Sequence, residues 1–269
     1  MPHSPAARGE ELYFCVKRAD MEENRYFSDL WLWKGGAAKR LTSSGDVNGF
    51  WLTEAGVVFS ALREKRDKER AEAGEPLTVL QLLPYDGGEA RELCRLDCAV
   101  TALRFAGEGR FFFTADCSRD WDAALAQAQG DAKAAAEALK RSRAECRVID
   151  ELPFWFNGRG FINKKRNRLY LYNAKKKKLQ ALTEPLFDVG GVKFCSKCGK
   201  VAYTGHTFNA RRAQSSALYL YDVETGETSC LVEDGTYSIG SFCFDNAHGE
   251  IVFSANPIKD GYPAPGNNL

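Results

Sequence analysis

The sequence predicts an all-β fold, a β-propeller, from two repeated patterns and the spacing that they share. The first pattern alternates leucine with aromatic or other large residues, which is typical of strands packed on both faces. Its copies are Leu218-Tyr-Leu-Tyr-Asp222, Leu169-Tyr-Leu-Tyr-Asn173, Leu30-Trp-Leu-Trp33 and the weaker Leu80-Gln-Leu-Leu83. After both Leu218 and Leu80, a glycine follows at 8 residues and a leucine at 13. Each copy therefore predicts a strand, a tight turn and a second strand.

A second predicted hairpin precedes each copy. An aromatic residue leads into a short polar turn with glycine near its end, and an apolar strand closed by Ser or Thr follows. These hairpins span Trp51–Ser60, Phe105–Thr114, Phe194–Thr204 and Phe244–Ser254. Glycine supplies the positive φ that such turns need. Two hairpins make four strands, and a four-stranded unit that repeats about every 50 residues indicates a propeller blade.

The repeats predict about four and a half four-stranded blades over residues 1–269, and so an incomplete propeller domain. The first two blades span about 11–41 and 47–96, the third starts at Val100, and the fourth spans 186–232. The fifth starts at Ser238 and contains only its first hairpin. Because an unpaired sheet edge can pair with another chain, we expect marginal stability or self-association through the open edges.

The third blade is predicted to carry a small helical insertion at residues 117–147. Phe105 and Phe194 are 89 residues apart, whereas Trp51 and Phe105 are 54 apart. Between Trp121 and Cys146, alanines and leucines recur at helical spacing. We expect two short helices there, with Asp131 capping the second. The charged run 63–75 has alternating signs and no aromatic residues, so a solvated loop or short surface helix is preferred to a nucleic-acid patch.

An aromatic segment, Glu151-Leu-Pro-Phe-Trp-Phe-Asn-Gly158, follows the insertion. The preferred interpretation is that its aromatic side chains pack the insertion onto the blade. The functional alternative is a patch that faces a ligand channel, where Phe154 and Trp155 contact a substrate and the acidic Asp150 and Glu151 hold a cationic group.

Composition excludes several function classes. The net charge of +1 suggests neither nucleic acid nor a membrane surface as a partner. No apolar run approaches the ~18 residues of a membrane span. The first residues lack the apolar stretch of a signal peptide, so we expect a cytoplasmic protein with reduced cysteines.

Two cysteine pairs, Cys195 with Cys198 and Cys94 with Cys98, have spacings compatible with structural zinc. The pairs fall in different blades, however, and the first occupies a polar turn that other copies of the repeat fill with other residues. A turn is therefore preferred, no metal or cofactor is expected, and a zinc-stabilised scaffold is the weaker alternative.

The blades, the alanine-rich insertion and the Glu151–Gly158 segment followed by Arg168-Leu-Tyr-Leu-Tyr172 resemble one known arrangement. They resemble the N-terminal propeller of the prolyl oligopeptidase family, in its acylaminoacyl-peptidase and dipeptidyl-peptidase-like branch. The resemblance implies a seven-bladed propeller that admits short peptides to an α/β-hydrolase domain with a catalytic Ser, Asp and His.

The sequence departs from that family in having fewer blades and no α/β-hydrolase domain. Gly-x-Ser-x-Gly is absent, and the nearest string, Gly235–Gly240, has one residue too many before its serine. Three histidines, His3, His206 and His248, offer no credible triad, and a structural role is preferred for His206 over the alternative that it faces the central channel. No catalytic residue is therefore assigned, and we expect this chain to be inactive alone. It is expected to gate and select peptides for a hydrolase domain outside it, or alternatively to be a stand-alone binding propeller.

Overall fold

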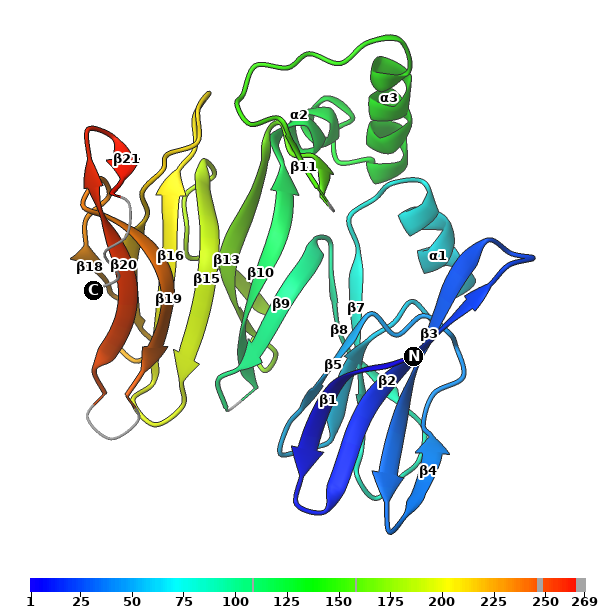
Figure 1. The fold of residues 1–269 in the computed structure, drawn as a ribbon. Coiled ribbons are helices and arrows are strands. Elements are labelled where there is room, and N and C mark those ends of the chain that lie inside the picture. The colour runs from blue at the N-terminus through cyan, green and yellow to red at the C-terminus, as the bar shows by residue number, and fades with distance from the viewer. Residues whose placement is uncertain (108, 158, 246–248, 265–269) are drawn as a thin grey trace. The chain divides into compact units, whose positions relative to one another are not determined.

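The structure is a computed structural model that describes residues 1–107, 109–157, 159–245 and 249–264. The chain forms two compact units, one made of residues 1–99 with 132–137 and the other of 100–131 with 138–269. Both consist mainly of antiparallel sheets (Figure 1). His248 lies outside the described residues.

The first unit contains two four-stranded sheets, each with its strands in chain order. The first sheet is β1 (Pro2–Arg8), β2 (Glu11–Asp20), β3 (Arg25–Lys34) and β4 (Ala37–Arg40). The second is β5 (Gly49–Leu52), β6 (Val57–Ser60), β7 (Thr78–Leu83) and β8 (Arg91–Leu96). Helix α1 (Lys65–Glu72) lies between β6 and β7, so the charged run forms a short helix.

The second unit holds three blade sheets and the two-stranded sheet of a short hairpin. The third blade is β9 (Ala99–Phe105), β10 (Arg110–Ser118), β13 (Lys165–Asn173) and β14 (Lys178–Ala181). The fourth is β15 (Phe187–Cys195), β16 (Lys200–Thr207), β17 (Ala217–Asp222) and β18 (Thr228–Val232). The fifth is β19 (Tyr237–Phe244), β20 (Ile251–Lys259) and β21 (Tyr262–Pro263). Strand β15 contacts β13 of the third blade and β19 of the fifth, so the three sheets follow one another in chain order (Figure 1).

The predicted helical insertion lies between the second and third strands of the third blade. It contains α2 (Arg119–Gln127) and α3 (Ala132–Glu145), followed by the short hairpin of β11 (Trp155–Phe156) and β12 (Gly160–Phe161). The Ser118 hydroxyl caps α2 by accepting a hydrogen bond from the backbone N–H of Trp121. The all-β fold with a helical insertion in its third blade is confirmed.

All four copies of the leucine pattern form the third strand of a sheet. Their leading leucines are 0–1% exposed: Leu30 in β3, Leu80 in β7, Leu169 in β13 and Leu218 in β17. In the fourth blade Leu218 packs with Ala202 and Phe242, so its side chain fills the space between the fourth and fifth sheets. The alternation of large side chains therefore indicates strands that pack against a neighbouring sheet through their leading leucine.

The strands β1 and β21, at the edges of the first and fifth blades, were not predicted from the sequence. The first blade was expected to begin near Glu11, but β1 pairs with β2 through contacts such as Ala7 with Leu12. Its sequence has two prolines and no apolar alternation, because this exposed edge strand packs little of its surface. The fifth blade gains β21, in which only two residues pair with β20.

Replacing Leu218 by Ala should lower the free energy of unfolding by about 2–5 kcal/mol, because the cavity left behind adds to the lost apolar burial. Leu231 lies in the same sheet, on β18, but is 47% exposed. Its replacement by Ala is the matched control and should change stability by about 0.5 kcal/mol or less. Urea unfolding measures both. Equal losses for the two variants would contradict the assignment of Leu218 to the core.

Candidate functional site

A buried ion pair anchors the segment that follows the helical insertion. Glu151 is 4% exposed and Arg166, on β13, is 1% exposed. The pair is bidentate, with Arg166 Nη2 2.7 Å from Oε1 of Glu151 and Nη1 3.1 Å from Oε2. The backbone N–H of Lys164 donates to the same Oε2 at 2.6 Å. Both carboxylate oxygens of Glu151 are thus bound within the protein.

Arg166 also holds the segment that follows β16. Its Nε donates to the carbonyl oxygen of Phe208 at 3.1 Å, and its guanidinium lies 3.9 Å from the centroid of the Phe208 ring. A guanidinium is well suited to this environment, because it combines a planar hydrogen-bonding fork with a face that stacks on aromatic rings. Glu151 and Arg166 therefore join three segments that are distant in the sequence.

The other acidic residue proposed for substrate binding, Asp150, is exposed. Lys164 Nζ lies 3.2 Å from its Oδ2. Desolvation opposes any lowering of the pKa of Asp150, but hydrogen bonds from Lys164 and Asn163 outweigh it and the pKa is lowered. Of the two predicted acids, Asp150 alone presents its carboxylate at the surface.

The aromatic side chains of the segment remain largely accessible, which differs from the packing role that the sequence favoured. Trp155 is 50% exposed, and Phe154 and Phe156 are each more than a third exposed. Phe154 stacks on Phe161 with ring centroids 6.3 Å apart, and Arg212 lies over the ring of Phe156 at 5.5 Å. The ion pair anchors the segment, and its aromatic rings stay at the surface. A substrate-binding role for Asp150, Glu151, Phe154 and Trp155 stays a prediction.

A cavity of about 600 Å³ lies beside this segment. We call it the blade-4/5 cavity. Its lining includes Pro153 and Phe156 of the aromatic segment rather than Phe154 and Trp155. The rest comes from β15, β16, β19 and the connection before β17, including Gly190, Gly191, Lys193, His206, Arg212, Ser216, Ser238, Gly240 and Ser241. A volume of this size is typical of a small-molecule site.

Two equivalent β-bulges form part of the cavity wall. β15 is irregular between Val189 and Val192, and β19 between Ile239 and Phe242. In the fourth blade the Thr204 hydroxyl accepts from the backbone N–H of Gly191 at 3.1 Å. In the fifth, Ser254 accepts from Ser241 at 3.1 Å. A Ser or Thr within each second strand therefore fixes the bulge in the strand before it.

Glycine suits the first of these bulges, because neighbouring side chains leave little space for a Cβ. A Cβ at Gly191 would lie 3.0 Å from the ring of Phe242, and one at Gly190 would lie 3.2 Å from the Thr204 hydroxyl. This wall was not predicted from the sequence. A signal was present, because Gly190-Gly191 and Gly240-Ser241 lie 50 residues apart, which is the period of the repeat.

His206 on β16 also lines the cavity and is 5% exposed. Its Nε2 has no hydrogen-bond partner among the residues that the structure describes. Burial lowers the pKa of His206, and the charges of Arg212 and Arg166 lower it further, against the opposing effect of Asp188 and Asp234. The imidazole is therefore neutral near pH 7.

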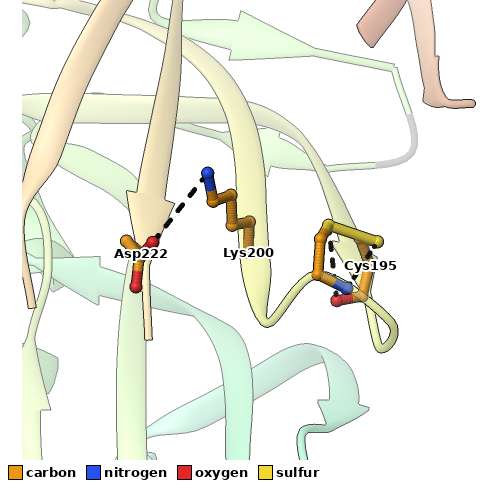
Figure 2. The surroundings of a disulfide bond; sticks show 4 residues. Cys195, Lys200 and Asp222 are labelled. Carbon is orange, nitrogen blue, oxygen red and sulfur yellow. Dashed lines mark hydrogen bonds and ion pairs between the residues drawn. A yellow bond between two sulfur atoms is a disulfide. The ribbon is translucent and has the colours of Figure 1, made fainter. Parts of the chain in front are cut away.

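The cysteine pair Cys195 and Cys198 occupies the turn between β15 and β16 (Figure 2). The two sulfur atoms form a disulfide, so the expectation of reduced cysteines is wrong at this pair. In the disulfide form these two sulfur atoms cannot serve as thiolate ligands of zinc. Among the described residues, no group of three or more His, Cys, Asp or Glu is placed to hold a metal ion. None of the described helices is long and apolar enough to cross a membrane.

Comparison with solved structures identifies the fold. An acylaminoacyl peptidase from Pyrococcus horikoshii aligns over 96% of this chain with a TM-score of 0.66 and 13% identity. The β-propeller domain of the Trilobed protease from Pyrococcus furiosus aligns over 97%, with a TM-score of 0.51 and 7% identity. The fold is a β-propeller. This chain spans 36% of the acylaminoacyl peptidase chain and 70% of the Trilobed protease domain.

The propeller is shared by proteins of other activities. An apocarotenoid oxygenase from Synechocystis aligns over 92% of this chain and 53% of its own, with a TM-score of 0.52 and 12% identity. No family model and no curated protein sequence matches this chain. The predicted resemblance to a peptidase propeller is thus confirmed as a likeness of fold.

Replacing Glu151 by Gln should destabilise the protein by about 3–5 kcal/mol, because it leaves the buried Arg166 charge without its counter-ion. Replacing the neighbouring Asp150 by Asn should leave stability unchanged, because its exposed ion pair with Lys164 is solvated. Chemical unfolding of both variants measures the difference. A stable Glu151→Gln variant would show that the pair does not anchor this segment.

His206 should make stability depend on pH. Its folded pKa lies below the unfolded value near 6.5, so the unfolded chain binds more protons as the pH falls. The contribution of neutral His206 to the free energy of unfolding is present above pH 6.5 and is lost as the pH falls through the folded pKa. Replacing His206 by Asn should flatten this loss in urea unfolding between about pH 7.5 and pH 5.5. Replacing His3, an exposed residue of the other unit, should leave the loss unaltered.

Proposed function

We propose that this chain is the propeller region of an acylaminoacyl-peptidase-like serine peptidase. In this proposal the propeller admits and selects short peptides for a hydrolase domain outside these 269 residues. The observation that carries it is the likeness to the Pyrococcus horikoshii enzyme over 96% of the chain. Its TM-score of 0.66 exceeds the 0.51 and 0.52 of the Trilobed protease domain and the oxygenase.

The exposed aromatic segment supports the same proposal. Trp155 and Phe156 form a strand of the β11–β12 hairpin and offer apolar surface beside the blade-4/5 cavity. Aromatic rings bury large areas with little loss of side-chain freedom, so such a strand suits contact with varied peptide side chains. We assign peptide selection to Trp155 and Phe156, with Asp150, which immediately precedes the segment, as the accessible acid.

The alternative is a stand-alone binding propeller without catalytic activity. The observation that favours it is that residues 100–269 line the blade-4/5 cavity by themselves. Such a protein needs no second domain to complete its binding site. The two functions differ in whether a reactive serine accompanies this sequence.

Fluorophosphonate labelling of the native source extract separates the two functions. We expect a labelled species that contains this sequence and is much heavier than 29.9 kDa. Intact mass and peptide sequencing of the labelled species measure this. An unlabelled protein near 29.9 kDa would contradict the peptidase proposal and favour the binding propeller.

In the active enzyme that the labelling identifies, prepared without the probe, Trp155→Ala should lower kcat/KM for peptide substrates by about two- to tenfold, the value of one aromatic contact. Hydrolysis of a small activated ester should be unchanged, because it needs no contact with the propeller. Tyr26→Ala is the control, since this exposed aromatic lies in the other unit. Equal effects on peptide and ester would exclude a selective role for Trp155.

A further inference from the structure

We propose that the blade-4/5 cavity is a binding site for an oxyanion and that its ligand is a carboxylate. The inference stands independently of the proposed peptidase function, because it rests on the charges and donors of the cavity wall.

The wall carries positive charge without a counter-ion. Arg212 and the exposed Lys193 both line the cavity, and no Asp or Glu is among the described residues that line it. Neither cation forms an ion pair with any residue that the structure describes. Three other arginines with restricted exposure have carboxylate partners: Arg166 binds Glu151, Arg95 binds Asp67 and Arg70 binds Glu75. An anion from outside the chain would complete this site.

The nearest acidic groups are already engaged. Asp188 on β15 accepts a hydrogen bond from the backbone N–H of Asn167 at 2.8 Å. Asp234, before β19, accepts from the backbone N–H of Gly235 at 3.0 Å and from the Ser215 hydroxyl. Both lie close enough to influence His206, but neither lines the cavity. Neither Asp188 nor Asp234 therefore pairs with the guanidinium of Arg212.

Arg212 is held in position to receive a ligand. Its backbone N–H donates to the carbonyl oxygen of Leu152 at 2.9 Å, which ties it to the aromatic segment. Its guanidinium lies over Phe156, and the side chain is half-buried. A planar guanidinium binds a carboxylate through two parallel hydrogen bonds, and partial desolvation strengthens both. The neutral imidazole of His206 and the hydroxyls of Ser216 and Ser238 add polar groups to the same wall.

A carboxylate fits this wall better than a phosphate. Phosphate sites are built from several free backbone N–H groups. Here the bulge amides of Gly191 and Ser241 already donate to Thr204 and Ser254. Pro153, Ile239 and Phe242 add apolar surface that suits the organic part of a carboxylic acid. The ligand class is therefore a small organic or peptide carboxylate.

The test compares three probes on the purified chain by calorimetric titration. They are an N-acetyl tripeptide with a free C-terminal carboxylate, the same tripeptide as its C-terminal amide, and inorganic phosphate. We expect the free acid to bind at least about tenfold more tightly than the amide, as loss of a charged hydrogen bond dictates. Phosphate should bind no better than the amide.

Variants then assign the binding to the cavity. Arg212→Gln should weaken binding of the free acid about tenfold or more, whereas Arg211→Gln, an exposed neighbour that does not line the cavity, should change it less than about twofold. Far-UV circular dichroism checks that both variants are folded.

The proposal is overturned if acid and amide bind alike, if no probe binds, or if the two arginine variants behave alike. Binding of phosphate without the acid would overturn the carboxylate assignment. The comparison of acid with amide on the unaltered chain needs no variant, so misfolding of Arg212→Gln leaves the test decisive.

Discussion

The ion pair between Glu151 and Arg166 is the interaction on which the second unit's candidate site depends. A charge pair buried this deeply is tolerated only when every polar atom has a partner, because desolvation of each ion costs several kcal/mol. The backbone of Lys164 and the carbonyl of Phe208 supply the remaining partners. By binding residues from the insertion, from β13 and from the chain after β16, the pair places Pro153 and Phe156 at the cavity.

The cavity wall combines two kinds of support. The bulges of β15 and β19 are fixed within their own hairpins, by Thr204 and Ser254. The aromatic segment is fixed from outside those hairpins, by Arg166 and by the hydrogen bond between Arg212 and Leu152. Rigid blades thus carry one side of the site and an irregular connection carries the other, an arrangement in which loops on a stable scaffold hold the binding groups.

Local patterns in the sequence were sufficient for the blades and the insertion. The leucine alternation identified third strands, because a strand buried on both faces must be apolar at nearly every position. The β1 strand escaped notice because an edge strand with prolines needs no such pattern. The partnership of Glu151 with Arg166 was also not predictable, since the residues lie 15 apart and only the path of the chain brings them together.

The acidic and aromatic character of residues 150–156 drew attention to a segment of which Pro153 and Phe156 line the blade-4/5 cavity. The four residues chosen from it do not line that cavity, and their substrate-binding role stays a prediction. Arg212 and Lys193 belong to no sequence motif. They stand out because neither forms an ion pair with a described residue, and the sequence alone cannot reveal that. The bulge glycines were recoverable in principle, because they recur with the repeat.

The hydroxyl-fixed bulge has a consequence for how such a pocket can change. Because Thr204 and Ser254 act within single hairpins, each half of the wall folds together with its own blade. A duplicated blade therefore contains its own bulge together with the hydroxyl that fixes it. The glycine-to-serine difference between positions 191 and 241 shows two versions of one half-wall in the same molecule. Substitutions at the bulge positions can change the ligand preference of the cavity, while the buried leucines that hold the blades together are unchanged.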